Sequence, residues 1–381
     1  MHRYRLLFFP HLLACLCMLL FPHSAGARAG ADGQSLERMA GQMIMVGFRG
    51  TGEPPLGEDL HFLLEDIPAG RIGGVILFEP DYLTKKIRNI RSLEQTAALI
   101  RRLQHNAPIP LFVGVDQEGG KVRRFKEEHG VSPTPSAAEL GRGAPEATRA
   151  EGARLGRALH AIGVNLNFAP SLDVDANPAS PAIGALGRSF SALPGSVAAH
   201  GAAFAQGLFS AGIIPCYKHF PGHGSATADT HLGLADVTAT WSEAELAPYR
   251  DILPETVPAM VMPGHIVHRE KSGNLPASLS YEVISGILRG ELGWRGVVIT
   301  DDLQMRAVEG RFSTKEAIRL AVLAGGDVLL FGNNLRHDPE EGRKAHALLL
   351  ELVREGAVPE ARIRESYERI LKLKRAAGLL E

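Results

Sequence analysis

Short apolar runs alternate with segments of helical period along this chain, from about residue 40 to its C-terminus. The eight apolar runs occupy residues 42–48, 73–78, 110–116, 164–170, 213–220, 259–265, 296–302 and 327–332. Between most of them, apolar residues recur at helical spacing in 93–104, 146–163, 197–212, 244–253, 281–292 and 315–326. Strands that alternate with helices in this way form a parallel sheet.

Eight such strand–helix units in residues 35–381 predict one α/β domain, a single (β/α)8 barrel of the TIM type with two additional C-terminal helices. An open, doubly wound sheet is the alternative, because periodicity alone does not distinguish the two architectures. Two features favour the barrel. No glycine-rich phosphate-binding motif follows any predicted strand, and polar residues follow nearly every strand instead of gathering at one switch point.

Capping signals indicate where several of the predicted helices begin and end. A serine is followed three residues later by Gln or Glu at Ser92–Gln95, Ser242–Glu245 and Ser313–Glu316, which is the spacing of a capping box. Glycines end the helical segments at Gly163, Gly212, Gly293 and Gly325. These glycines predict left-handed C-terminal caps.

The first 29 residues differ from the rest of the chain. Basic residues in MHRYR precede the apolar run LLFFPHLLACLCMLLF, and small residues follow in SAGARAGA. This order predicts a secretory signal peptide at 1–29 that is removed, with export to the periplasm or the outside of the cell. An uncleaved membrane anchor fits less well, because Pro10 and His11 interrupt the run. Lipid attachment at Cys15 is a minor alternative, since the apolar run continues past that residue.

Charge and cysteine content narrow the classes of partner. The formal net charge is −1 with acidic and basic residues well mixed, so no basic face predicts binding to nucleic acid. Once the signal is removed, Cys216 is the single cysteine, and its apolar neighbours predict a core position without a disulfide. The expected partner is therefore a small or neutral molecule, without stable insertion into a membrane after cleavage.

Polar side chains follow the predicted strands at nearly every C-terminal end. They belong to Asp116, Gln117, Glu118, Asp173, Asp175, Lys218, His219, His265, Asp301, Asp302, Asn333 and Asn334. In a barrel these strand ends converge, so residues that are distant in sequence share one pocket. Carboxylates, cationic groups and a glycine-rich loop together predict a site that binds hydroxyl groups and transfers protons.

The loop KHFPGHGSATADTH, residues 218–231, carries more ionisable groups than a connecting turn requires. A metal site is one interpretation, since the loop offers four ligands: His219, His223, Asp229 and His231. The proline and glycines of PGHG oppose it, because they prevent the regular helix that would align two histidines. Hydrolysis is the second interpretation, with Asp301 or Asp302 as a nucleophile and the loop as the source of the acid. A binding barrel without chemistry is the third.

Four segments occur in order along the chain: VDQEGGKVRRF, LGRSF, KHFPGHGSATADTH and VVITDDLQM. Together they resemble the β-N-acetylglucosaminidases of glycoside hydrolase family 3, of the type that processes bacterial cell walls. The resemblance implies a (β/α)8 barrel that removes terminal β-linked N-acetylglucosamine with retention of configuration, without a metal or organic cofactor. The implied substrate is an amino-sugar oligosaccharide, either a muropeptide or a chitooligosaccharide.

The resemblance also implies roles for particular residues. Asp301 is the implied nucleophile, His231 the acid/base and Asp229 the partner of His231, while Asp302 is expected to orient or support. The implied sugar-binding residues are Asp116, Arg124, Arg188, Lys218 and His219. A neighbouring aspartate favours the imidazolium form of histidine, so we expect His231 to protonate a leaving oxygen near neutral pH.

Several points stay open at the level of sequence. Ser225 follows GHG where the family often has Asp, which affects the hydrogen bonding of the loop. Phosphate in place of water as the acceptor would make the protein a phosphorylase. A β-glucosidase is the weaker alternative, because such relatives usually carry a second large domain. Arg123 is an alternative to Arg124, and His265 is expected either to contact substrate or to pack. Trp241 and Trp294 are expected to pack.

Overall fold

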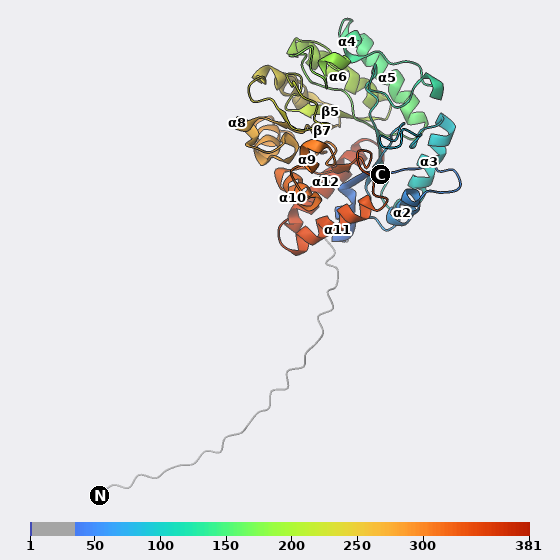
Figure 1. Cartoon of the computed structure of the whole chain (residues 1–381), viewed down its shortest axis with the longest axis vertical. Helices are drawn as coiled ribbons and strands as arrows, with labels where there is room; N and C mark the ends of the chain where they lie inside the picture. The colour runs from blue at the N-terminus through green and yellow to red at the C-terminus, as the bar shows by residue number, and fades with distance from the viewer. Residues whose placement is uncertain (2–34) are drawn as a thin grey trace.

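The computed structural model describes Met1 and residues 35–381, so the predicted signal peptide lies outside the described residues except for Met1. The described chain forms one sheet of eight parallel strands with helices arranged around it (Figure 1). The strand order across the sheet is β10–β1–β2–β3–β4–β5–β7–β9. No helix within 35–381 is long and apolar enough to cross a membrane.

The strands of the sheet are β1 (Ile44–Gly47), β2 (Gly74–Ile76), β3 (Phe112–Val115), β4 (Leu166–Asn167), β5 (Ile214–Phe220), β7 (Met260–Pro263), β9 (Val297–Val298) and β10 (Leu329–Phe331). Each lies inside one of the eight apolar runs, which confirms the predicted strand positions. Met45 of β1 pairs in parallel with Leu330 of β10 and Gly74 of β2. Beyond the last strand, Ile299 bridges Val328 in parallel, so the sheet curls round towards its own first edge.

This strand order follows the sequence without a reversal, whereas a doubly wound sheet reverses at a switch point. The sheet therefore fits a barrel of the TIM type. Its strands are buried throughout, and apolar side chains such as Ile44, Val113, Ile214 and Val297 are fully inaccessible. The predicted core positions of Cys216, Trp241 and Trp294 are confirmed by their burial.

The helices are α1 (Leu36–Gln42), α2 (Glu58–Asp66), α3 (Leu93–His105), α4 (Ala137–Leu140), α5 (Pro145–Ala161), α6 (Pro194–Ser210), α7 (Ala247–Ile252), α8 (Arg269–Ser272), α9 (Arg306–Glu309), α10 (Thr314–Ala324), α11 (Glu341–Arg354) and α12 (Glu360–Ala376). Short 3-10 turns lie at η1 (Glu127–His129), η2 (Gly184–Leu186), η3 (Glu243–Glu245), η4 (Leu253–Glu255) and η5 (Ala277–Leu279). The helix predicted at 281–292 is a π-helix, η6 (Glu282–Glu291). The sequence patterns did not identify α1, α2 and the short helices α4, α8 and α9.

The predicted helix ends agree with the structure except at one position. Gly163, Gly212, Gly293 and Gly325 have φ values of 90°, 83°, 70° and 112°, so all four adopt the predicted left-handed conformation. The side chain of Ser92 accepts a hydrogen bond from the backbone N–H of Gln95, and that of Ser313 accepts one from the backbone N–H of Glu316. The capping box predicted at Ser242 is wrong, because Ser242 makes no capping bond and the side chain of Glu245 turns inward to another partner.

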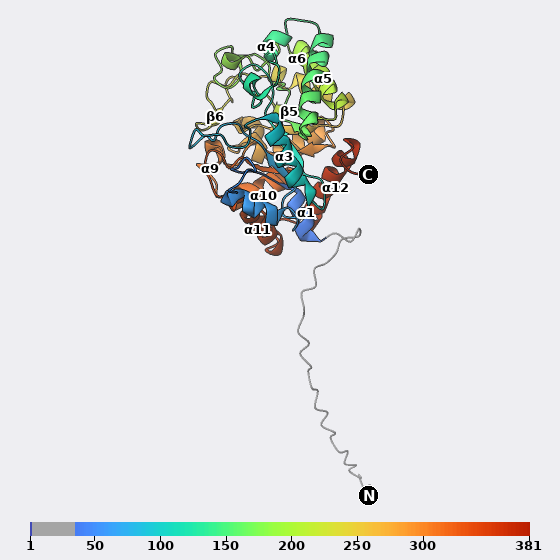
Figure 2. The same ribbon diagram turned by 90° about the vertical axis from the view of Figure 1, so that its right-hand side faces the viewer.

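Two helices follow the last strand of the sheet. α11 packs against α10, α1 and β1, where the helix of an eighth strand–helix unit belongs. α12 continues past it and packs beside α1 (Figure 2). Because α11 takes a place within the repeat, the prediction of two helices beyond the barrel is not confirmed.

A second, small sheet lies outside the barrel strands. β6 (Ala235–Asp236) pairs in parallel with β8 (Ile266–Val267), and the N–H of Val237 donates to the carbonyl of Val267 at 2.8 Å. This pairing joins the end of the histidine-rich loop after β5 to the segment that follows β7. The sequence patterns did not predict it, since each strand has only two residues.

Candidate active site

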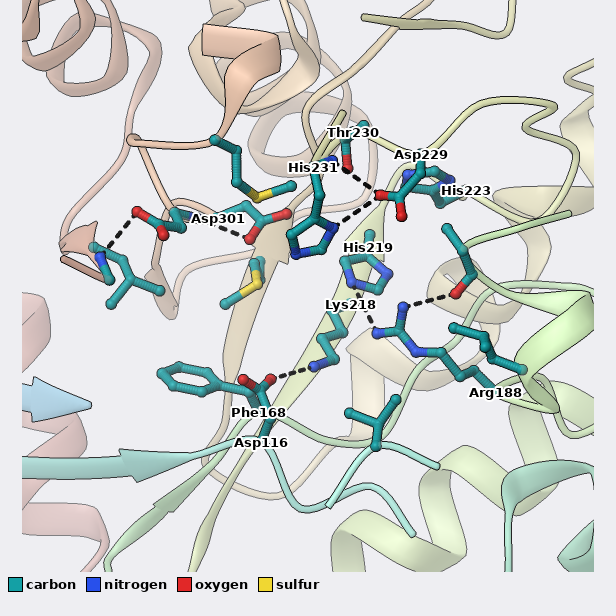
Figure 3. A pocket seen from close by; sticks show the side chains of 18 of the residues that line it. Asp116, Phe168, Arg188, Lys218, His219, His223, Asp229, Thr230, His231 and Asp301 are labelled. Atoms are coloured by element: carbon teal, nitrogen blue, oxygen red, sulfur yellow. Dashed lines mark hydrogen bonds and ion pairs between the residues drawn. The ribbon is translucent and has the colours of Figure 1, made fainter. Parts of the chain in front are cut away.

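One pocket gathers the eight residues that the resemblance assigned to catalysis or sugar binding (Figure 3). It lies at the C-terminal ends of the barrel strands and has a volume of about 230 Å³. Its lining includes Asp116, Arg124, Arg188, Lys218, His219, Asp229, His231 and Asp301. Pockets for drug-sized ligands span roughly 300–1,000 Å³, so this one suits a single group of the size of one sugar ring.

Five charged residues, which we name the ion-pair cluster, occupy one side of the pocket. Lys218 Nζ lies 2.8 Å from Asp116 Oδ1 and 2.7 Å from Glu118 Oε1. Arg124 donates to Asp116 at 3.2 Å, and Arg188 binds both oxygens of Glu118 at 2.7 and 2.9 Å. Burial opposes ionisation, but the charges of Arg188 and Lys218 lower the pKa of Glu118 to about 2. The cluster therefore holds fixed charges that can orient hydroxyl groups.

His219 lies between the ion-pair cluster and a buried aspartate. Its Nδ1 is 2.7 Å from Asp173 Oδ2, and its Nε2 is 3.3 Å from Arg188 Nη2. Arginine can only donate, so Nε2 of His219 accepts and Nδ1–H donates to Asp173. This arrangement fixes the plane of the His219 ring between Asp173 and Arg188.

The pair Asp229 and His231 lies on the glycine-rich loop after β5. Asp229 Oδ1 is 2.8 Å from His231 Nδ1 and accepts the backbone N–H of His231 at 2.9 Å. The side chain of His231 is 58% exposed, and Figure 3 shows it between Asp229 and Asp301. The hydrogen bond that His231 Nδ1–H donates to Asp229 raises the pKa of His231, and the same bond lowers the pKa of Asp229 to about 2. Since Nδ1 faces Asp229, Nε2 is the nitrogen left for a ligand.

Asp301 and Asp302 follow β9 but have different surroundings. Burial opposes ionisation of Asp301, yet the neighbouring histidines, with His265 first, hold its pKa below the ordinary value. Asp302 Oδ1 instead accepts the backbone N–H groups of Gly332 at 2.9 Å and Gln304 at 3.0 Å, and burial raises the pKa of Asp302 to about 6. Asp302 thus joins backbone segments, while the ionised carboxylate of Asp301 lines the pocket.

His265 forms a hydrogen bond with the chain segment that carries Asp301 and Asp302. Its Nε2 lies 2.8 Å from the carbonyl oxygen of Asp302 and its Nδ1 lies 2.6 Å from Ser278 Oγ. A carbonyl only accepts, so Nε2–H donates to the carbonyl oxygen of Asp302, and Nδ1 shares a second hydrogen bond with the serine hydroxyl. The ring is fully buried, and burial lowers the pKa of His265. Of the two predicted roles, packing matches this position.

Side-chain partners decide between two further pairs of alternatives. Arg124 binds Asp116, whereas Arg123 binds Glu127 at 2.8 Å, so Arg124 is the arginine at the pocket. Among residues 35–381, the His, Cys, Asp and Glu side chains whose possible metal-ligand atoms cluster within 4.8 Å are Glu79, Glu128 and His129. The four loop residues considered for a metal site do not form such a cluster in the described part of the chain.

Three residues at the site had no role in the sequence prediction. Glu118 and Asp173 directly follow predicted strands, so the signal that identified Asp116 was also present for them. Glu245 is different, because it lies on η3 and its spacing from Ser242 indicated a helix cap. Its carboxylate accepts the backbone N–H of Gly224 at 2.8 Å and that of Ser225 at 3.2 Å. Nothing in the sequence pattern distinguished this use from capping.

Comparison with known proteins identifies the family of the chain. The sequence profile of the glycosyl hydrolase family 3 N-terminal domain matches residues 35–373. The chain belongs to glycosyl hydrolase family 3. This family 3 chain is 32% identical over 387 residues to beta-hexosaminidase A of Pseudoalteromonas piscicida, covering 93% of this chain and 63% of that protein. It is 37% identical over 274 residues to a beta-hexosaminidase of Neisseria meningitidis serogroup B, covering 69% and 72%.

Solved structures of family 3 members have the same fold. A β-N-acetylglucosaminidase from a Paenibacillus species superposes with a TM-score of 0.81 at 35% identity, covering 91% of this chain and 63% of that one. A β-N-acetylhexosaminidase from Beutenbergia cavernae has a TM-score of 0.79 at 29% identity, covering 91% of this chain and 100% of that one. The family 3 chain thus spans less than two thirds of the Pseudoalteromonas and Paenibacillus proteins.

Proposed function

We propose that this chain is a retaining exo-β-N-acetylglucosaminidase that removes terminal β-linked N-acetylglucosamine from peptidoglycan fragments or related amino-sugar glycans. The observation that carries the proposal is the position of His231 beside Asp301 at one pocket (Figure 3). Asp229 holds His231 protonated, and the neighbouring histidines hold Asp301 ionised. Membership of family 3 and the relatives named beta-hexosaminidase support the choice of sugar.

In the first step, a carboxylate oxygen of Asp301 attacks the anomeric carbon of the sugar. His231 Nε2–H donates its proton to the glycosidic oxygen as the bond between that oxygen and the anomeric carbon breaks. The products are a glycosyl ester on Asp301, a neutral imidazole and the free aglycone. Most retaining glycosidases use a carboxylic acid for this proton transfer. Here the raised pKa of His231 supports an imidazolium as the acid near neutral pH.

In the second step, the neutral imidazole of His231 takes a proton from water while the water oxygen attacks the anomeric carbon. The ester bond to Asp301 breaks and the carboxylate is restored. Two displacements at one carbon retain the configuration of the sugar. Through both steps, the ion-pair cluster and His219 bind the sugar hydroxyls, and no metal or organic cofactor takes part.

The proposal includes export of the chain to the periplasm or the cell exterior, with residues 1–29 as a cleaved signal and lipid anchoring as a lesser alternative. The sequence of residues 1–29 supports it. The complete (β/α)8 barrel of residues 35–381 belongs to the same proposal, supported by the bridge between Ile299 and Val328.

The test uses protein that lacks residues 1–29, with aryl β-N-acetylglucosaminide and aryl β-glucoside as substrates. Wild type is expected to release the aryl group from the acetamido sugar alone. Asp301→Ala should lower kcat/KM by at least about 10³-fold, because the nucleophile is lost. His231→Ala should lower it by about 10²–10⁴-fold. His61→Ala is the control, since His61 is exposed on α2.

Each assay is run in phosphate and in non-phosphate buffer, and the sugar product is identified. N-acetylglucosamine in both buffers supports hydrolysis, whereas a sugar 1-phosphate formed in phosphate reassigns the chain as a phosphorylase. Cleavage of the glucoside alone would make it a β-glucosidase. A fully active Asp301→Ala protein would contradict the catalytic assignment.

A further inference from the structure

Glu245 is a buried acid next to the loop that carries Asp229 and His231. We name residues 221–234, between β5 and β6, the acid/base loop. The side chain of Glu245 is 0% exposed, and its Oε2 accepts the N–H groups of Gly224 at 2.8 Å and Ser225 at 3.2 Å. A buried carboxylate that accepts two backbone amides fixes the path of those residues.

The beginning of the acid/base loop is also in close contact with its surroundings. A Cβ on Gly222 would lie 2.5 Å from Cβ of Glu245, and a Cβ on Gly224 would lie 1.6 Å from the carbonyl oxygen of Val174. Asp173 accepts the N–H of His223 at 2.8 Å. Three consecutive amides, of residues 223–225, are therefore bound by two buried carboxylates.

The far part of the acid/base loop is far more exposed. The side chain of His231 is 58% exposed and Leu232 is 70% exposed. Asp229 binds His231 within the loop itself and so does not tie the pair to the barrel. The position of the pair relative to Asp301 therefore depends on where the loop is fixed at its two ends, at residues 223–225 and at β6.

We propose that Glu245 is a positioning residue, which fixes the beginning of the acid/base loop so that His231 reaches the leaving group of a substrate attacked by Asp301. This inference rests on the proposed function, and it assigns a role to a residue outside the pocket lining. Glu245 acts through the backbone of Gly224 and Ser225. Substrate binding in the ion-pair cluster is expected to be independent of it.

The surroundings of Glu245 make its hold on the loop dependent on pH. Two titratable groups interact with it: Asp173 after β4 and Tyr249 on α7. Burial raises the pKa of Glu245 to about 7, and the charge of Asp173 also raises it. The hydrogen bonds that the backbone N–H groups of the loop donate lower it. Because those bonds lower the pKa, ionisation favours the bound loop. The hydrogen bonds between Glu245 and the acid/base loop are thus stronger above pH 7 than below it.

The first experiment compares Glu245→Ala, Glu245→Gln and the control Glu243→Gln, an exposed residue on the same turn. Phenyl and 2,4-dinitrophenyl β-N-acetylglucosaminides serve as substrates, because the phenyl group needs a proton to leave and the dinitrophenyl group does not. For Glu245→Ala, kcat/KM should fall by about 10–100-fold with the phenyl substrate and by less than about 3-fold with the dinitrophenyl substrate. An equal loss on both substrates would indicate general damage and overturn the proposal.

The pH dependence of kcat/KM supplies a second readout. In wild type, the phenyl substrate should show an acid limb near pH 7, where Glu245 ionises. Glu245→Gln keeps one acceptor oxygen but does not titrate, so its acid limb should move to lower pH while most of the activity remains. Glu243→Gln should keep the profile of wild type. An unchanged limb in Glu245→Gln would contradict the proposal.

Hydrogen exchange measured by mass spectrometry tests the inference without any turnover. Peptides covering residues 222–234 should exchange faster in Glu245→Ala than in wild type or Glu243→Gln, with the barrel strands unchanged. Equal exchange in this segment would overturn the positioning role. An inactive wild type with faster exchange in the variant would refute the proposed function and keep the structural role of Glu245. If Glu245→Ala does not fold, the pH profile of Glu245→Gln decides between the outcomes.

Discussion

The carboxylates at the pocket differ in the number and kind of their partners, and these partners decide what each can do. Asp116 and Glu118 each meet two cations, so their charge is used to fix Lys218 and the arginines. Asp229 meets one imidazole, which it keeps protonated. The permanent negative charges are therefore on Asp116 and Glu118, and the transferable proton is on a different residue, His231.

Replacing Asp229 by Asn should alter the pH dependence more than the affinity for substrate. Asp229 raises the pKa of His231, and the acid works only while protonated, so activity is lost as pH rises through that pKa. In Asp229→Asn the pKa of His231 falls, and the basic limb of kcat/KM should move to lower pH. Asp236→Asn, an exposed aspartate of the adjoining β6, is the control and should leave the limb unchanged. A basic limb at the same pH in both variants would show that Asp229 does not control His231.

Among the secondary-structure elements, a single buried carboxylate connects the last helix to the sheet. Asp327 is fully inaccessible and accepts the N–H of Val298 at 2.9 Å. It also binds Arg289 of η6 at 2.7 Å, and Arg362 and Arg369 of α12 at 3.0 and 3.1 Å. One side chain therefore joins β9, the π-helix and α12.

We expect Asp327→Ala to lower the free energy of unfolding by about 3–5 kcal/mol, because removing Asp327 leaves the buried Arg289 without its counter-charge. Urea unfolding followed by circular dichroism measures the change. Asp251→Ala, an exposed aspartate on α7, is the control and should change it by less than about 0.5 kcal/mol. A loss below about 1 kcal/mol in Asp327→Ala would mean that the arginines find other partners.

The elements themselves were largely predictable, and the exceptions have physical causes. Eight apolar runs and four left-handed glycines follow from burial and backbone conformation, which are local properties of the chain. The converging strand ends then brought Asp116, Lys218 and Asp301 to one pocket. Glu245 was misassigned because a capping box and a buried acceptor share the same residue types. Which one forms depends on the tertiary approach of Gly224, and sequence spacing does not contain that information.

At the scale of the whole molecule, α1 at the beginning of residues 35–381 packs against α12 at their end. Lys374 of α12 is fully buried, donates to Gln42 Oε1 at 2.7 Å and lies 4.4 Å from the ring of Phe112. Burial lowers its pKa from 10.5 to about 7. A neutral lysine fits this site, and a charged one costs free energy because it loses its hydration.

The contribution of Lys374 to stability should therefore rise with pH in the alkaline range. The unfolded chain binds the proton of Lys374 up to its ordinary pKa, whereas the folded chain releases it near pH 7. Between pH 7 and 10 this difference adds on the order of 3 kcal/mol to the free energy of unfolding. Lys374→Met should remove that increase in urea unfolding measured across the range. Lys372→Met, exposed on the same helix, should retain it, and parallel curves for both variants would contradict the assignment.

The small β6–β8 ribbon has a consequence for how this architecture can change. Together with the hydrogen bonds that the backbone N–H groups of residues 223–225 donate, it fixes both ends of the segment 226–234, which carries the proposed proton donor His231. The entropy of closing a loop grows slowly, by about 0.6 kcal/mol for each doubling of length. The length and sequence of this segment can therefore change, by insertion or by replacement with the loop of another family member, at a small cost in free energy. A different proton donor for a different leaving group can be introduced there while the sheet, the proposed nucleophile and the proposed sugar contacts stay as they are.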